Sequence, residues 1–135
     1  MLNAESFFDL SSFDHPDLFR DTEYVWEALN QLKEYMADQH YINLPETVRP
    51  GEPLNRPVVI FEGECLTPDS LTFEIRDVTK GGLKIYKAGK LLQGASLIMA
   101  GAVILGRRIM IGRGSLIETG SFLQSPTIIG DNSEV

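Results

Sequence analysis

The feature that most constrains this chain is a six-residue repeat that begins at Met99 and runs to the last residue. Its fourth position holds Gly114, Gly120 and Asn132, residue types that readily adopt positive φ angles. A fixed short period of this kind is typical of a β-solenoid, in which short strands alternate with tight corners. We expect the first position, a large aliphatic residue in every hexad, to stack inside: Met99, Leu105, Ile111, Ile117, Leu123, Ile129 and Val135.

If three hexads complete one triangular turn, residues 99–134 form two turns whose strands stack about 4.8 Å apart. The alternative is a run of amphipathic hairpins whose glycine spacing is coincidental. Seven aliphatic residues in register favour the solenoid over the hairpins.

Residues 111–115, 117–121 and 126–135 resemble the repeats of the hexapeptide acyltransferases and sugar nucleotidyltransferases. The nearest likeness is to the β-helix of N-acetylglucosamine-1-phosphate uridylyltransferase-like proteins. The resemblance implies a mainly β fold, a left-handed parallel β-helix (a hexapeptide solenoid), preceded here by an α-helical segment. The handedness rests on the resemblance alone, because parallel crossovers are otherwise nearly always right-handed.

For function, the resemblance implies a transferase that moves an acyl, acetyl or nucleotidyl group to a sugar phosphate or nucleotide sugar. Acetyl-CoA or another acyl donor would serve the acyl reaction, and the protein would be a homotrimer. Such acyltransferases use a histidine as general base, whereas His15 and His40 both precede the repeats. We therefore name no catalytic residue and expect the active-site coils beyond Val135.

Three arginines at outward corner positions, Arg107, Arg108 and Arg113, are the candidates for binding a phosphate group. The planar guanidinium fork suits phosphate oxygens. The alternative is that they form a solubilising surface or an interface to the acidic N-terminal segment. Gly112 and Gly114 belong to a corner and do not form a phosphate loop, and no cluster with metal-ligand spacing is present in the sequence.

Charge is distributed unevenly along the chain. Residues 1–56 hold eleven acidic and four basic side chains, which accounts for the net charge of −7. Residues 57–135 hold eight of each, and the stretch 78–117 has seven basic residues and no acidic one. A nucleic acid is not the expected partner, because the total charge is negative and the basic stretch offers only Tyr86 for base stacking.

The pattern of residues divides the chain into an acidic helical segment with a Pro-rich linker (1–56) and a β region (57–135), with regular hexads from about 99. Within 1–41 we expect an amphipathic helix from Asp21 or Thr22 to about Asp38. Strands are expected at 58–61, 71–75 and 83–86, with a two-residue hairpin at Gly81–Gly82. Residues 57–98 are either irregular first coils or, as we favour for 70–87, a hairpin layer that caps the solenoid.

No stretch is long and apolar enough to span a membrane, and the N-terminus lacks the features of a signal peptide. Cys65 is the single cysteine, which favours a reducing compartment and hence a cytoplasmic location. A second functional class remains open: a non-catalytic scaffold or oligomerisation module, whose copies pair through the open C-terminal coil.

Overall fold

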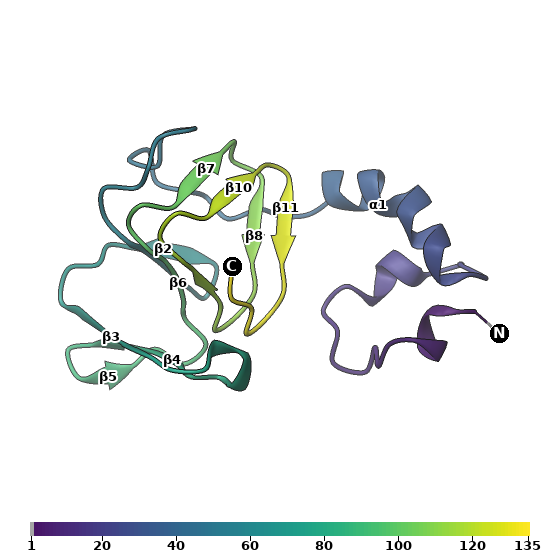
Figure 1. Cartoon of the computed structure of the whole chain (residues 1–135), viewed down its shortest axis with the longest axis horizontal. Coiled ribbons are helices and arrows are strands. Elements are labelled where there is room, and N and C mark those ends of the chain that lie inside the picture. The colour runs from purple at the N-terminus through teal and green to yellow at the C-terminus, as the bar shows by residue number, and fades with distance from the viewer. Residues whose placement is uncertain (1) are drawn as a thin grey trace. The chain divides into compact units, whose positions relative to one another are not determined.

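The computed structural model of the chain describes residues 2–135 and is mainly β, with one short α-helix (Figure 1). It divides into two compact units, Met1–His40 and Tyr41–Val135. Within residues 2–135, no helix has the length and apolar character needed to cross a membrane.

The first unit consists of short helical turns and one α-helix. α1 spans Ala28–Ala37 and follows the 3-10 turns η1 (Ala4–Ser6), η2 (Pro16–Phe19) and η3 (Val25–Glu27). The predicted helix start near Asp21 or Thr22 is therefore too early. The Glu27 carboxylate accepts hydrogen bonds from the backbone N–H groups of Glu23 and Tyr24, at 2.6 and 2.9 Å. These residues thus remain outside the helix, with their N–H groups satisfied.

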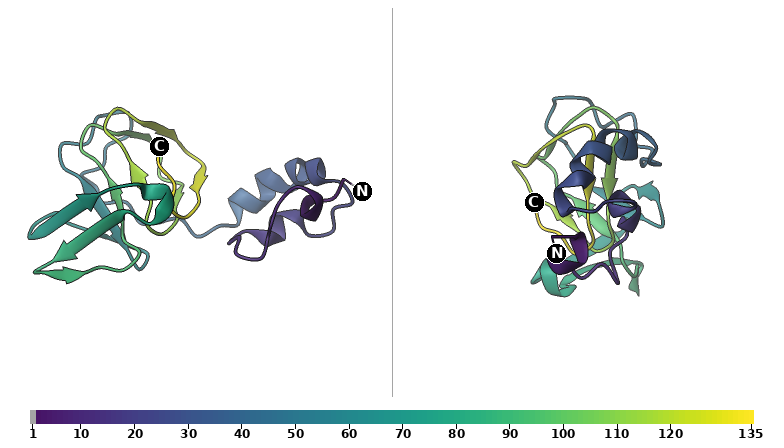
Figure 2. Two further views of the ribbon diagram at one scale, coloured as in Figure 1. Left: turned by 60° about the horizontal axis from the view of Figure 1, so that its bottom comes forward. Right: turned by 90° about the vertical axis from the view of Figure 1, so that its right-hand side faces the viewer.

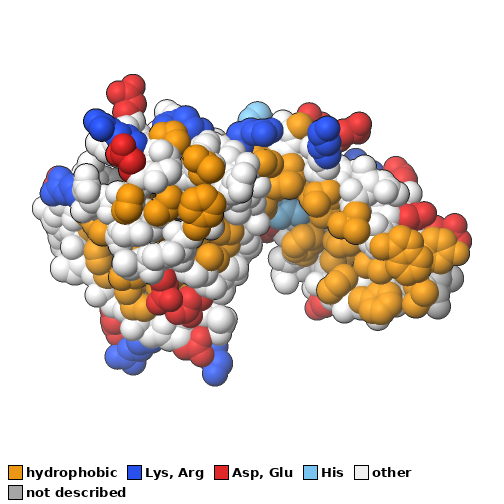
Figure 3. Space-filling view, turned by 45° about the horizontal axis from the view of Figure 1, so that its top comes forward, with side chains coloured by type: hydrophobic (Ala, Val, Ile, Leu, Met, Phe, Trp, Pro, Cys, Tyr) orange, Lys and Arg blue, Asp and Glu red, His pale blue; other side chains and the backbone are white. Residues whose placement is uncertain are grey.

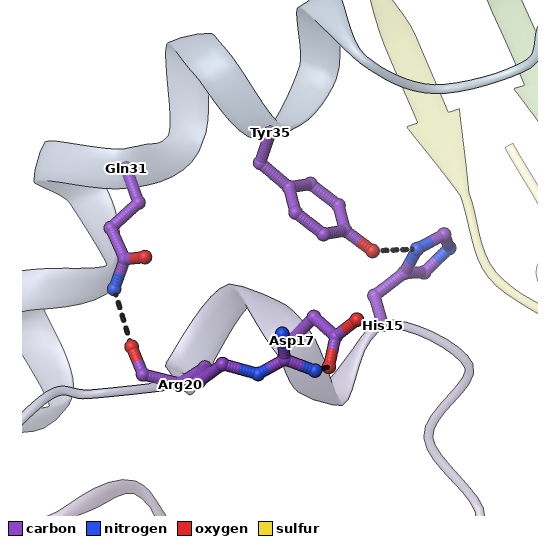
Figure 4. A network of polar contacts seen from close by, with 5 residues as sticks. All are labelled: His15, Asp17, Arg20, Gln31 and Tyr35. Carbon is purple, nitrogen blue, oxygen red and sulfur yellow. Dashed lines mark hydrogen bonds and ion pairs between the residues drawn. The ribbon is translucent and has the colours of Figure 1, made fainter.

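Polar contacts join α1 to the turn η2 (Figure 4). His15 Nδ1 lies 2.6 Å from the Tyr35 hydroxyl oxygen, and Gln31 Nε2 donates a hydrogen bond to the Arg20 carbonyl oxygen at 2.9 Å. Burial, with a smaller contribution from Asp17, raises the pKa of the Tyr35 hydroxyl above its usual range. Tyr35 therefore remains uncharged at neutral pH as the hydrogen-bond partner of His15.

The second unit is built from short strands. Strands predicted at 58–61 and 71–75 are confirmed, and the strand predicted at 83–86 extends one residue further. The strands are β1 (Val58–Phe61), β2 (Glu64–Leu66), β3 (Leu71–Ile75), β4 (Leu83–Lys87), β5 (Lys90–Leu91), β6 (Ser96–Ile98), β7 (Val103–Leu105), β8 (Ile109–Ile111), β9 (Leu116–Ile117), β10 (Phe122–Gln124) and β11 (Thr127–Ile129).

These strands form small separate sheets with both kinds of pairing. One sheet has the order β2-β1-β6-β9, in which β1 is antiparallel to β2 and β6 while β6 is parallel to β9. β7 with β10 and β8 with β11 form two-stranded parallel sheets. β3, β4 and β5 form an antiparallel sheet that extends away from the remaining strands of the unit (Figure 2).

The predicted left-handed parallel β-helix is therefore wrong: the sheets are small and mixed, and none of those described is closed or coiled. The repeat strands are only two or three residues long, because glycine-rich corners interrupt them. The repeat nevertheless places equivalent strands side by side. Val103 pairs with Phe122, nineteen residues on, and Ile109 pairs with Thr127, eighteen residues on.

The hexad register also differs from the one predicted. Leu105 was expected inside, but its side chain is 39% exposed, whereas its neighbour Ile104 is fully buried. Ile111, Ile117 and Leu123 are buried as predicted, and Met99 and Ile129 are partly buried, but Val135 was also expected inside and is 44% exposed. The step from Ile104 to Ile111 is thus seven residues instead of six, and the additional residue lies in the corner that includes Gly106 and Arg107.

The Pro-rich segment 41–57 belongs to the second unit and packs into it. Leu44, Val48 and Leu54 are buried in the same core cluster as Ile104 and Ile117. The segment also covers strand edges, since the Ile42 N–H donates to Ile109, Gly51 to Ile104 and Leu54 to Ala102 through backbone hydrogen bonds. We call residues 41–57 the strap.

The antiparallel layer of β3, β4 and β5 confirms the hairpin predicted for residues 70–87, but no solenoid forms for it to cap, and the predicted two-residue turn is wrong. Seven residues, 76–82, join β3 to β4 and contain the 3-10 turn η4 (Val78–Lys80). The Asp77 carboxylate accepts a hydrogen bond from the Thr79 N–H at 3.1 Å, and Val78 is fully buried. The cap at Asp77 and the burial of Val78 favour this longer connection over a tight turn.

Candidate functional site

The three candidate arginines have different surroundings. The Arg107 guanidinium donates hydrogen bonds to the carbonyl oxygens of Leu44 and Val48, so it holds the strap against the corner after β7. Arg108 is exposed, and its backbone N–H donates to Ser125 Oγ at 3.0 Å. Arg113 is also exposed, and no hydrogen bond or ion pair of its guanidinium is found among residues 2–135. Among the described residues, the guanidinium groups of Arg108 and Arg113 are therefore both available to a ligand, whereas that of Arg107 is engaged.

Stacked corners fix the position of Arg113. Its backbone N–H donates to Asp131 Oδ1 at 2.7 Å, and its carbonyl oxygen accepts from the Asn132 N–H at 2.8 Å. On the other side, the guanidinium lies against Gly94. A Cβ atom at Gly94 would lie 2.5 Å from Arg113 Nε, and Gly94 has φ +79°. Glycine at position 94 thus allows the guanidinium to lie close to the backbone.

Two hollows of the second unit meet at Arg113, with volumes of about 470 and 240 Å³. Gln93, Gly94 and Arg113 line both. The larger hollow is otherwise lined by Ile42, Ile60, Glu62, Gly63, Ser96, Ile111 and Gly112, and the smaller one by Gly81, Leu83, Gly114, Asp131 and Asn132. Neither hollow is lined by Arg107 or Arg108, so the three arginines do not form one binding site.

The two hollows differ in chemical character. The larger includes three isoleucine side chains, which suit an apolar or aromatic group, whereas the amide groups of Gln93 and Asn132 suit hydroxyl groups in the smaller. One carboxylate lines each hollow, Glu62 and Asp131. These carboxylates repel an anion, so an anionic group is favoured only at the guanidinium itself, where the fork of N–H donors matches phosphate or carboxylate oxygens.

The described residues around Arg113 offer groups that can bind a ligand. His15 and His40 both lie in the first unit, and His15 is engaged with Tyr35. Across residues 2–135, no group of three His, Cys, Asp or Glu side chains could hold a metal ion. Half-buried Cys65 lines a separate hollow of about 270 Å³, and burial raises the pKa of its thiol. A neutral thiol is a poor nucleophile at neutral pH.

Sequence reasoning singled out Arg113 but missed the residues around it, notably Gln93, Gly94 and Asn132 as lining groups. Gly94 precedes Arg113 by nineteen residues, and Asp131 follows it by eighteen. Three uninterrupted hexads would place Ala95, eighteen residues earlier, beside Arg113. The additional residue between Ile104 and Ile111 makes this step nineteen residues, so the repeat alone could not have identified Gly94.

In comparisons with known proteins, no protein-family model, curated protein or solved structure matches this chain.

Proposed function

We propose that this chain binds the phosphate group of a sugar phosphate or nucleotide sugar through Arg113, as part of a hexapeptide-repeat transferase. The observation that carries the proposal is the guanidinium of Arg113, which has no partner among the described residues and lies where two hollows meet. The larger hollow suits a base or acyl group and the smaller one a sugar. The resemblance of the hexads supports the ligand class and makes acetyl-CoA or another acyl donor the co-substrate to examine.

Calorimetric titration of the full chain with a uridine nucleotide sugar, inorganic phosphate and acetyl-CoA tests this proposal. Charge-assisted hydrogen bonds contribute about 1.5–3 kcal/mol, so Arg113→Ala should weaken binding by about tenfold or more. Arg113→Lys keeps the charge but loses the bidentate geometry, so its affinity should lie between those of the wild type and Arg113→Ala. Arg108→Ala is the matched control, because Arg108 lines neither hollow.

The free energy of unfolding of each variant shows whether weaker binding reflects a lost contact or a loss of folding. Because Arg113 is exposed, Arg113→Ala should change the free energy of unfolding by no more than about 0.5 kcal/mol. Binding by Arg113→Ala that equals the wild type, or the absence of binding to any of the three compounds, would contradict the proposal.

A second proposal is a non-catalytic assembly module, which the absence of a histidine from residues 41–135 favours. Copies would pair through the edges of β10 and β11, each of which is paired in the sheet order with one strand only, or assemble as the trimer that the resemblance implies. Sedimentation equilibrium over micromolar concentrations tests it: an oligomer is expected, and a monomer at every concentration would refute it.

For either proposed function we expect a cytoplasmic location, on the basis of the single cysteine.

A further inference from the structure

The first unit exposes large apolar side chains together. Leu29 is 70% exposed, and Phe7, Phe8 and Trp26 are each more than half exposed. The Trp26 ring stacks on Tyr24, with ring centroids 4.9 Å apart and an interplanar angle of 6°. We call these five residues the aromatic face; Figure 3 shows hydrophobic side chains gathered over this unit with acidic side chains around them. Grouped exposure of this kind marks interaction surfaces.

A hollow of about 290 Å³ lies in the aromatic face. Its lining is entirely apolar and comes from several turns as well as α1: Phe8, Leu18, Phe19, Val25, Trp26, Ala28, Leu29 and Leu32. A hollow with this lining fits a large apolar side chain and offers no polar group to orient a polar ligand. Its natural occupant is therefore an apolar anchor that projects from a partner.

Charge restricts what that partner can be. Residues 1–40 hold nine acidic and two basic side chains, a net charge of −7 with neutral histidines. Arg20, one of the two basic residues, is already paired with Asp17. Glu5 and Asp9 flank the two phenylalanines in sequence, and Glu23 and Glu27 flank Tyr24 and Trp26. Two copies meeting through this face would each bring −7, and an anionic lipid surface would be repelled as well.

We propose that the aromatic face binds a segment of another protein that carries a large apolar side chain flanked by lysine or arginine. The apolar side chain enters the hollow beside Trp26 and Leu29, while the flanking cations lie near the surrounding carboxylates. Charge complementarity then provides specificity and speeds association, and burial of the apolar anchor provides affinity. This inference is independent of ligand binding at Arg113.

Trp26 is the only tryptophan of the chain, so its fluorescence reports directly on the aromatic face. The probe is a synthetic amphipathic peptide of leucine and lysine, blocked at both ends, titrated into the full chain. We expect a saturable blue shift of the Trp26 emission and a weaker affinity as NaCl is added. The same peptide with glutamate in place of every lysine is the control and should give no shift.

Variants locate the binding on the surface. Leu29→Asp should weaken binding of the Leu/Lys peptide by at least tenfold, whereas Ile75→Asp, at a 45% exposed residue of β3 in the second unit, should bind as the wild type does. Glu5→Lys combined with Glu23→Lys keeps the apolar face and reverses two charges, so it should weaken binding several-fold even if Leu29→Asp is poorly folded. Circular dichroism checks that each variant retains its helix.

Three results would overturn the proposal. The first is equal affinity for the lysine and glutamate peptides. The second is wild-type affinity in both Leu29→Asp and the double charge variant. The third is a self-associated free chain whose Trp26 emission is already that of a buried indole, since a second copy would then occupy the face.

Discussion

Gly106 and Gly120 are two corner glycines of the second unit. Comparing their alanine variants distinguishes the cost of backbone strain from the cost of steric crowding. Both have positive φ, +99° and +88°, but a Cβ at Gly106 would lie 2.4 Å from Ser125 Cβ, whereas a Cβ at Gly120 would meet nothing within 4 Å. Gly120→Ala should lower the free energy of unfolding by about 1–3 kcal/mol through strain alone. Gly106→Ala should lose about 1–3 kcal/mol more through overpacking. Urea unfolding of both variants measures the difference, and equal losses would contradict the close approach at Ser125.

The half-buried thiol of Cys65 gives the chain a predictable pH dependence. Burial raises its pKa, so the folded state favours the protonated thiol. The corresponding stability is complete below the thiol's ordinary pKa and is lost as the pH rises through the raised value. We expect slow reaction of Cys65 with a disulfide reagent at neutral pH, accelerated by urea. In Cys65→Ala the alkaline pH dependence of stability should be reduced, and the part due to Tyr35 should remain. Reaction as fast as that of a short cysteine peptide would contradict the burial.

At the scale of the elements, the change of register before β8 determines which aliphatic side chains enter the core. Ile104→Asp places a carboxylate at a fully buried position and should cost several kcal/mol, because no partner compensates the buried charge. Leu105→Asp changes the neighbouring residue, which is 39% exposed, and should cost less than about 1 kcal/mol. Thermal unfolding of the pair decides between the two registers, and the reverse order of stabilities would restore the uninterrupted hexad register.

The sequence could predict β1 and β3 because runs of β-branched and aromatic residues bounded by turn residues depend on local chemistry. The change of register could not be predicted, because Ile104 and Leu105 are chemically equivalent and only the corner between them and Ile109 decides which one faces inward. The strap has a similar explanation. Its prolines correctly exclude regular secondary structure, but the burial of Leu44 and Val48 depends on strands more than fifty residues further along the chain.

For the whole molecule, the period indicated that distant strands lie in parallel, but it could not predict how the sheets are completed. β1 pairs antiparallel with β6, and β3–β5 form a sheet of their own, so the β-helix expected from the repeat alone does not form. The candidate site was likewise predictable only in part from the sequence. Arg113 was identified because corner positions face outward, whereas the engagement of Arg107 with the strap needed three-dimensional contacts.

The uneven charge leads to a prediction for the whole molecule. Residues 1–40 carry −7, whereas residues 41–135 hold ten acidic and ten basic side chains. Repulsion within the first unit extends about 30 Å at 0.01 M salt but only about 8 Å at 0.15 M. Since each close like-charge pair costs about 0.2–0.5 kcal/mol, added NaCl should stabilise the first unit by roughly 1 kcal/mol and leave the second nearly unchanged.

Two probes separate the units in one urea titration of the full chain. Trp26 fluorescence follows the first unit, because the chain has no other tryptophan, and the accessibility of Cys65, the single cysteine, to a disulfide reagent follows the second. The midpoint of the Trp26 transition should rise with salt while the midpoint of Cys65 exposure stays constant. Equal shifts would mean that salt acts on burial in general, and a constant Trp26 midpoint would mean that the acidic side chains are too far apart to repel. Only a rise of the Trp26 midpoint at a constant midpoint for the second unit identifies self-repulsion in the first unit. A cationic partner that binds the aromatic face would relieve the same repulsion.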